Sequence, residues 1–196
     1  MKNLDKGLIP KICIWIGICL IVVGSLILIS WQCNIHFSEK KAETYLQTLR
    51  TLIPYPQGAT LEERRDNTMP ILSIDGIDFV GILEMPLYES VVPVCADWGH
   101  LTKYPCRLSG SAYDRTIQVG ATSQKGQYDF YREISVGDSI YFTDVEGNRY
   151  TYTITNLRYE KNANQTTLKR AESALTLFIK NVYDFEYLIV SCDTVN

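Results

Sequence analysis

Cysteine and histidine are the side chains of this sequence with the most obvious capacity for covalent chemistry. The chain holds six Cys and two His. A thiolate beside an imidazole can attack a carbonyl group and form a covalent intermediate. His100 ends the polar run Asp97-Trp98-Gly99-His100, which lies between Cys95 and Cys106. One hypothesis is therefore an enzyme in which His100 works with Cys95, Cys106 or Cys192.

Other site chemistries have less support. No C-x-x-C pair occurs, and His36 and His100 are far apart in the chain, so we expect no metal site. No glycine-rich phosphate loop occurs, and we expect no cofactor. The formal charge of −3 offers no field for polyanions, which argues against a nucleic-acid partner.

An uncharged apolar stretch near the N-terminus is suited to a lipid bilayer, whereas the rest of the chain is suited to water. Ile12 to Trp31 contains no charged residue, and Gln32 and Cys33 extend the stretch. Twenty helical residues cover about 30 Å, the thickness of a bilayer core. We predict a transmembrane signal-anchor helix over residues 12–33.

The charges beside this helix predict its orientation. Lys2, Lys6 and Lys11 stand against Asp5 in residues 1–11. Positive flanks stay inside the cell, so we expect a cytoplasmic tail and a single pass through the cell membrane. The C-terminal part of the chain is then extracellular.

An extracellular address permits disulfides. Cys95, Cys106 and Cys192 follow the membrane segment, and the candidate pairs are Cys95–Cys106 and Cys106–Cys192. Three buried free thiols are the alternative, since free Cys is among the most buried residue types.

Residues 34–68 are predicted to form a stalk helix followed by a linker. Ser38 can cap a helix whose apolar residues recur every three or four positions up to Ile53. Pro54 stops it, and the polar residues after it are typical of a linker.

From residue 69 onward the pattern changes to short β-rich runs between turn residues, which is typical of a barrel or sandwich. Asp75-Gly76 is a pair favoured in type I′ hairpins. Only Tyr128 to Ile134 and Gln165 to Ser173 have a helical pattern. Eight strands are predicted: Pro70 to Ile74, Ile77 to Leu83, Ser90 to Cys95, Thr116 to Val119, Ser139 to Thr143, Arg149 to Leu157, Leu175 to Ile179 and Tyr187 to Cys192.

The order of these segments is itself informative. It runs MPILSIDGIDFVGILEMP, VVPVC, YPCRLSGSAYD, TIQVGAT, LTLF and YLIVSC. In this order they resemble the sortases, membrane-anchored cysteine transpeptidases of Gram-positive bacteria that join secreted proteins to the cell wall or to pilins. The resemblance implies a mainly β domain over residues 69–196, a closed eight-stranded barrel with short helices.

The resemblance also locates the positions of the sortase catalytic groups. The family's His ends a strand of the type V-I-A-G-H, and Thr122 stands there. The nucleophile ends L-T-L-F-T-C, which puts Lys180 in its place, and the Arg opens R-V-x-V-x-C, where the sequence has Tyr187. No Cys or His occurs between Leu108 and Ser191, so a shifted alignment restores neither group.

We therefore expect an inactive sortase homologue that keeps a peptide groove at Thr122, Lys180 and Tyr187. Its expected partners are the sorting-signal peptides of secreted surface proteins or pilins, or an active sortase. Three alternatives stay open: relocated catalytic groups around His100, a lysine-assisted catalyst at Lys180, and a purely structural module.

Overall fold

The computed structural model describes residues 8–58, 67–161, 173–184 and 186–195. They fall into two compact units, Met1–Ser38 and Glu39–Asn196. The long helix α1 (Leu8–Leu52) begins in the first unit and ends in the second. Residues 1–7 of the predicted tail, residues 59–66 of the predicted linker and most of the predicted helix 165–173 lie outside the described residues.

The described part of the first unit is the apolar portion of α1. Its segment Cys13–Ser30 has a mean hydropathy of 2.7, and none of it is buried inside the protein. Its large side chains stay exposed, as with Leu26 at 60%. Such a helix is compatible with a single-pass membrane anchor.

The end of α1 belongs to the second unit. The predicted apolar stripe is confirmed, since Tyr45 and Leu49 on α1 and the following Ile53 are buried. The predicted cap at Ser38 is wrong, because Ser38 lies inside the helix. No Pro or Gly interrupts residues 31–38, and extending a helix is cheaper than starting a second one. The helix ends at Leu52, just before Pro54.

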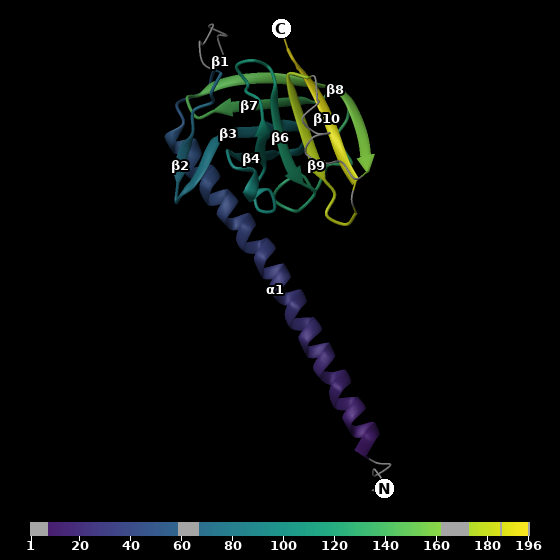
Figure 1. The fold of residues 1–196 in the computed structure, drawn as a ribbon. Coiled ribbons are helices and arrows are strands. Elements are labelled where there is room, and N and C mark those ends of the chain that lie inside the picture. Colours follow the sequence, from purple (N-terminus) through teal and green to yellow (C-terminus); the bar gives the residue numbers. More distant parts are fainter. Residues whose placement is uncertain (1–7, 59–66, 162–172, 185, 196) are drawn as a thin grey trace. The chain divides into compact units, whose positions relative to one another are not determined.

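Ten strands form one sheet in the second unit (Figure 1). Two 3₁₀ turns, η1 (Pro86–Tyr88) and η2 (Trp98–His100), interrupt the strand order. The strands are β1 (Gln57–Gly58), β2 (Leu72–Ile74), β3 (Ile77–Met85), β4 (Ser90–Cys95), β5 (Cys106–Ser109), β6 (Ile117–Thr122), β7 (Ser139–Asp144), β8 (Asn148–Lys161), β9 (Leu175–Lys180) and β10 (Glu186–Thr194).

Eight of these strands close into a barrel. The pairing runs β8-β10-β9-β6-β5-β4-β3, and β7 joins β3 to β8 and completes the ring. β1 and β2 are attached to β8 and β3 outside the ring. The predicted closed eight-stranded barrel is confirmed.

The ring differs from the predicted strand set in one member. The sequence pattern favoured Pro70 to Ile74, which forms β2 at the margin, and missed β5. β5 has only four residues, is enclosed by Pro105 and Gly110, and pairs with β4 at a single position. A strand this short shows too little alternation to be recognised.

Two local predictions can be compared directly with the backbone. Asp75 and Gly76 both have positive φ, 51° and 77°, so the type I′ turn is confirmed. The predicted helix over Tyr128 to Ile134 is wrong. That segment is a series of turns, in which main-chain N–H groups donate to the carbonyl three residues earlier, as Tyr131 N–H does to the Tyr128 carbonyl.

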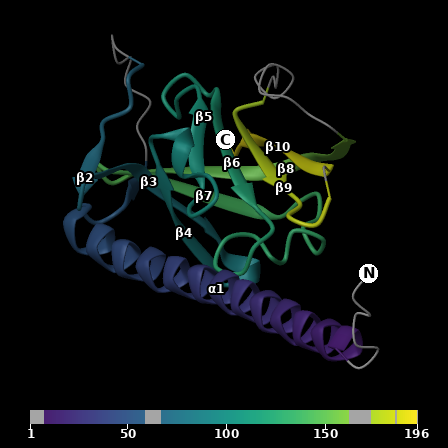
Figure 2. The same cartoon turned by 60° about the horizontal axis from the view of Figure 1, so that its bottom comes forward.

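Two apolar clusters stabilise the second unit. The larger one fills the barrel and includes Tyr152 and Ile154, which alternate along β8 with the polar Thr151, Thr153 and Thr155. The smaller one lies between the end of α1 and the outside of β3 to β5, and it includes Leu49, Phe79 and Tyr104. Figure 2 shows this end of α1 beside β2 and β3. The barrel is thus covered on one outer side.

Candidate functional site

The three positions given by the sortase resemblance lie side by side in the sheet. β6 and β9 are parallel, and their last residues, Thr122 and Lys180, are register partners. β10 runs antiparallel to β9, and Tyr187 near its start is the register partner of Lys180. The carboxyl ends of two strands and the amino end of the third therefore meet at one edge (Figure 1). We call Thr122, Lys180 and Tyr187 the strand-end row.

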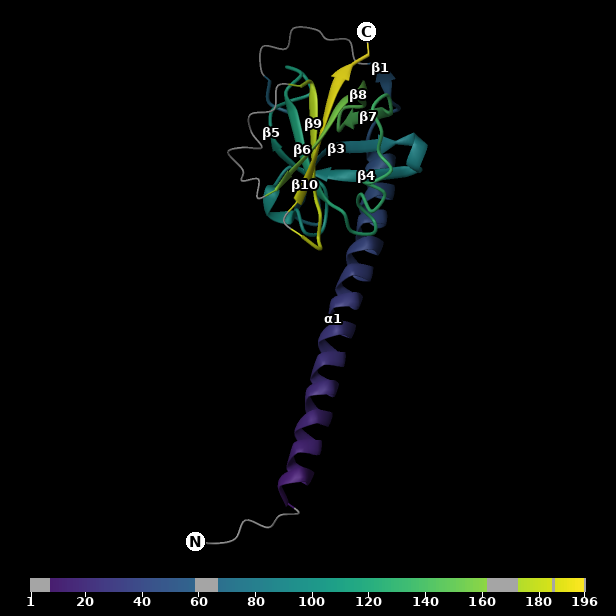
Figure 3. The same ribbon diagram turned by 90° about the vertical axis from the view of Figure 1, so that its right-hand side faces the viewer.

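The strand-end row belongs to the outer face of the barrel. Ala121, Ile179 and Leu188, the neighbours of the row along each strand, point into the barrel cluster. Because side chains alternate along a strand, the row points the other way. Figure 3 shows β6, β9 and β10 together from the side.

Main-chain contacts fix the position of Thr122. Its N–H donates to Gln127 Oε1 at 2.9 Å, and its carbonyl accepts from Tyr128 N–H at 3.2 Å. Ser123 N–H donates to the Lys180 carbonyl at 2.9 Å, which ties the ends of β6 and β9 together. The residue is 4% exposed, yet Thr122 Oγ1 has no hydrogen-bond partner among the described residues. A buried hydroxyl of this kind gains from a ligand atom that can pair with it.

An apolar platform adjoins the strand-end row on the same face. Phe178 of β9 and Ile189 of β10 are register partners, and both are almost fully buried. Leu108 and Tyr187 pack against them. Burial raises the pKa of Tyr187 above its ordinary value, so its hydroxyl keeps its proton at neutral pH and can donate.

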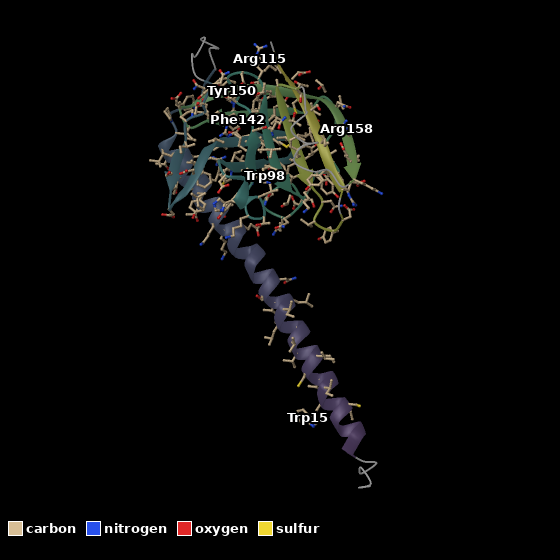
Figure 4. All side chains as sticks on the ribbon, viewed as in Figure 1. Trp15, Trp98, Arg115, Phe142, Tyr150 and Arg158 are labelled. Carbon is tan, nitrogen blue, oxygen red and sulfur yellow. The ribbon has the colours of Figure 1, made fainter. Side chains whose placement is uncertain are left out.

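Trp98 covers β6 beside Thr122. Gly120 lies two residues before Thr122 on the same face, and a Cβ there would come within 2.2 Å of Trp98 Cη2. Asp97 holds the Trp98 turn, since its Oδ1 accepts from Gly99 N–H at 2.8 Å. Figure 4 shows Trp98 over the barrel near β6. The indole therefore needs a glycine beneath it.

Comparison with known proteins agrees with this architecture. No family model and no curated protein matches the sequence. Among solved structures, sortase A from Corynebacterium diphtheriae is 13% identical, with 83% of this chain and 84% of that chain covered and a TM-score of 0.51. Sortase C-3 from Streptococcus pneumoniae is 15% identical over 83% and 84% of the two chains, with a TM-score of 0.52. Sortase C1 from Streptococcus agalactiae is 17% identical over 63% and 71%, with a TM-score of 0.51.

The chain has a sortase-like fold. The fold implied by the order of sequence segments is thereby confirmed. At these identities the likeness concerns the fold, and the chemistry has to be argued from the side chains of this barrel.

The thiols of the sortase-like barrel lack the features of a nucleophile. Cys106 is fully buried, and a hydrogen bond with Cys95, together with burial, raises its pKa well above the usual range. Burial likewise raises the pKa of Cys192 inside the barrel. Catalytic cysteines need the opposite shift, because the thiolate is the reactive form.

The described side-chain contact of His100 is with a carboxylate and not with a thiol. Its Nε2 lies 4.0 Å from Asp97 Oδ2, and it is the His100 main chain that interacts with Cys106. The Cys106 thiol itself donates to the Tyr104 carbonyl at 3.2 Å. The hypothesis of relocated catalytic groups therefore gains no support from these contacts.

The lysine-assisted alternative, by analogy with Ser–Lys enzymes, would need a serine nucleophile beside Lys180. Ser123 is the nearest serine along the paired strand, and its Oγ accepts from Val182 N–H at 3.1 Å. That oxygen therefore has a structural use.

Within the described residues, no group of three or more His, Cys, Asp or Glu could hold a metal ion.

Sequence reasoning missed the surroundings of the strand-end row. It did not identify the Phe178–Ile189 platform, the Gln127 contact or the cover by Trp98. Gly120 inside a strand was a usable signal, since such a glycine often marks the close approach of another group. A cavity of about 360 Å³ lies elsewhere, between the end of α1 and β4, and is lined by residues such as Leu46 and Val92.

Proposed function

We propose that this protein is a membrane-anchored sortase homologue without transpeptidase activity, which binds peptides on the outer face of its barrel. The observation that carries the proposal is the strand-end row. Thr122, Lys180 and Tyr187 are register neighbours at the strand ends where the resemblance expects His, Cys and Arg.

The three side chains cannot perform the sortase reaction. A threonine hydroxyl is a far weaker acid than imidazolium and does not protonate a leaving amine. An amine at Lys180 forms no thioester, so the acyl-enzyme that a second amine would resolve cannot arise. A phenol at Tyr187 offers one donor, whereas guanidinium offers a charged fork to a developing oxyanion.

The same side chains suit peptide binding. Thr122 Oγ1 is buried without a partner among the described residues, and Lys180 adds a positive charge beside it. Tyr187 supplies an aromatic face and a hydroxyl next to Phe178 and Ile189. A ligand with carbonyl or carboxylate oxygens and apolar side chains would be complementary to this surface. Sorting-signal peptides of surface proteins or pilins have this chemistry, and an active sortase could present one.

The proposal places the barrel outside the cell of a Gram-positive bacterium, with residues 1–11 in the cytoplasm. The apolar helix and the lysines before it support this orientation. Protease added to intact protoplasts should digest the barrel and spare the N-terminal tail. Protection of the barrel would reject this orientation.

The direct test uses the full chain in detergent, a labelled LPxTG-type peptide and an amine acceptor. We expect no cleavage product by mass spectrometry and measurable peptide binding by fluorescence anisotropy. Lys180→Ala and Tyr187→Ala should each weaken binding roughly tenfold, about 1.4 kcal/mol. Arg115→Gln is the matched control, since Arg115 precedes β6 at its other end (Figure 4). Thiol-dependent cleavage would overturn the proposal and favour an active enzyme.

A restoration experiment tests the position of the row. A triple variant with Thr122→His, Lys180→Cys and Tyr187→Arg should produce detectable cleavage of the same peptide. The control variant carries Lys180→Ser in place of Lys180→Cys and should produce no cleavage, because it has no thiol at this position. Normal folding without any turnover would mean that the strand-end row is not the equivalent of the sortase site.

A further inference from the structure

Cys95 and Cys106 lie opposite each other on two neighbouring strands. Cys95 ends β4, Cys106 begins β5, and the two are register partners in a parallel pairing. Cys95 N–H also donates to the Pro105 carbonyl at 2.8 Å. Neighbouring strands lie about 4.8 Å apart, inside the range of about 4.4–6.8 Å that a disulfide requires between Cα atoms.

The third barrel cysteine is placed differently. Cys192 lies on β10, and the order β5-β6-β9-β10 puts three strand spacings between it and Cys106. It packs inside the barrel, whereas Cys95 and Cys106 belong to the cluster under α1. Three spacings amount to about 14 Å, which is too far for a bridge. Of the two pairings that the sequence leaves open, the geometry favours Cys95–Cys106.

The surroundings of the pair indicate when a bridge could form. Both side chains are fully buried and, like Cys192, are free thiols in the structure. The pKa of the Cys106 thiol is raised by its hydrogen bond with Cys95 and by burial. In the finished fold such a thiol is neither accessible nor ionised, so exchange with a dissolved disulfide would be very slow. Oxidation therefore has to occur while the chain folds.

We propose that Cys95 and Cys106 form a disulfide when the chain folds in an oxidising compartment. One thiolate attacks a donor disulfide of the glutathione type and releases one thiol, and the second cysteine then displaces the other. The two protein thiols are oxidised, a new S–S bond forms, and the donor leaves as two thiols. In the cell this rests on the extracellular orientation proposed above.

The bridge would close the loop that positions Trp98. Residues 96–105 leave β4 and return to β5, and they carry Trp98, whose indole lies against Gly120. A covalent link at the base of this loop limits how far it can move away from the barrel. The disulfide would thus stabilise the loop beside the strand-end row, and it does not depend on peptide binding.

The test refolds the reduced full chain in detergent with oxidised glutathione, blocks free thiols and digests with trypsin without reduction. Trypsin releases Cys106 in the tetrapeptide Tyr104 to Arg107 and Cys95 in residues 66–103. We expect these two peptides to be joined. Blocked thiols at both positions, or a link from the tetrapeptide to residues 181–196 that carry Cys192, would overturn the proposal.

Matched variants separate the bridge from other effects. Cys192→Ala should leave the linked peptides intact, whereas Cys95→Ala should abolish them and leave Cys106 blocked. Reduction should lower the Tm of the wild-type barrel by about 5–10 °C and have little effect on Cys95→Ala. Refolding requires neither a peptide ligand nor a membrane orientation, so a failure here would leave the proposed function untouched.

Discussion

The two faces of β6, β9 and β10 are built from the same backbone but under different constraints. The inner face is apolar where it packs in the barrel cluster, at Ile117, Val119, Ala121, Leu175, Leu177, Ile179, Leu188, Val190 and Cys192. The outer face of the same strands carries Gln118, Gly120, Thr122, Thr176, Phe178, Lys180, Tyr187, Ile189 and Ser191. The inner face specifies the barrel through packing, and the outer face determines what chemistry the barrel can perform.

This difference separates fold from activity. Packing accepts many apolar combinations of the right volume, so a sortase-like barrel can form at low sequence identity. Catalysis needs particular groups at particular atoms, and the strand-end row, which we propose as the equivalent of the catalytic site, has a hydroxyl, an ammonium and a phenol. A sortase-like fold is therefore no indication of transpeptidase activity by itself.

The largest expected effect comes from the inner face. Leu177→Ala removes a side chain that is 1% exposed and packs between β6 and β10. Leaving a cavity in a packed core should lower the free energy of unfolding by about 2–5 kcal/mol. Urea unfolding of the full chain in detergent, followed by tyrosine near-UV circular dichroism, measures it.

Lys180→Ala on the same strand is the outer-face counterpart. Its side chain is partly exposed, and we expect a change of about 0.5 kcal/mol or less. Equal losses for both variants would mean that the two faces are not divided between packing and binding as described.

A smaller effect is expected where the outer face itself is packed. Gly120→Ala places a Cβ within 2.2 Å of Trp98 Cη2, so the indole must move. We expect a loss of about 1–3 kcal/mol, as for other overpacked sites. Since the φ of Gly120 is not positive, the backbone accepts alanine and the cost comes from this contact.

The double variant isolates that contact. In a Trp98→Ala background, Gly120→Ala should leave the free energy of unfolding unchanged or raise it by up to about 1 kcal/mol, since alanine is favoured over glycine in a strand. Trp98 emission, measured with Trp15 and Trp31 replaced by Phe, should shift to the red in Gly120→Ala alone. An unchanged penalty in both backgrounds would place its origin elsewhere.

The same contrast explains how far the sequence can be interpreted. Alternation marks Tyr152 and Ile154 as inward, and Asp75-Gly76 marks the turn, because each follows from local rules. The register of Thr122, Lys180 and Tyr187 was reached through family resemblance, since the residues themselves carry no catalytic pattern.

What the sequence could not predict depends on contacts between distant segments. β5 exists because β4 and β6 are beside it, and its four residues alone do not specify a strand. The continuity of α1 through Ser38 depends on the absence of a stop signal, while a local cap pattern suggested the contrary. Trp98 in η2 lies over Gly120 in β6, and the separation of these two elements in the chain hides the contact.

A smaller effect than at Gly120 is expected for a polar atom on the inner face. Tyr152 is fully buried, and its hydroxyl has no hydrogen-bond partner among the described residues. Tyr152→Phe removes a desolvated hydroxyl without breaking a bond, so the free energy of unfolding at pH 7 should stay equal or rise by about 1 kcal/mol. Tyr159→Phe, at an exposed position, is the control and should change nothing.

The pH dependence provides a second readout with a definite sign. Burial raises the pKa of Tyr152 above its ordinary value of 10.0, so the folded barrel keeps the phenol neutral where the unfolded chain ionises. The contribution of the buried neutral Tyr152 to the free energy of unfolding is complete below about pH 10. It is lost as the pH rises toward the pKa of Tyr152 in the folded protein, by up to about 1.4 kcal/mol per pH unit. Tyr152→Phe should therefore lessen the fall in stability between pH 10 and pH 11, measured by urea unfolding at both values. A loss of 1 kcal/mol or more at pH 7 would instead mean that the hydroxyl has a bonding partner, and that the inner face is not purely a packing surface.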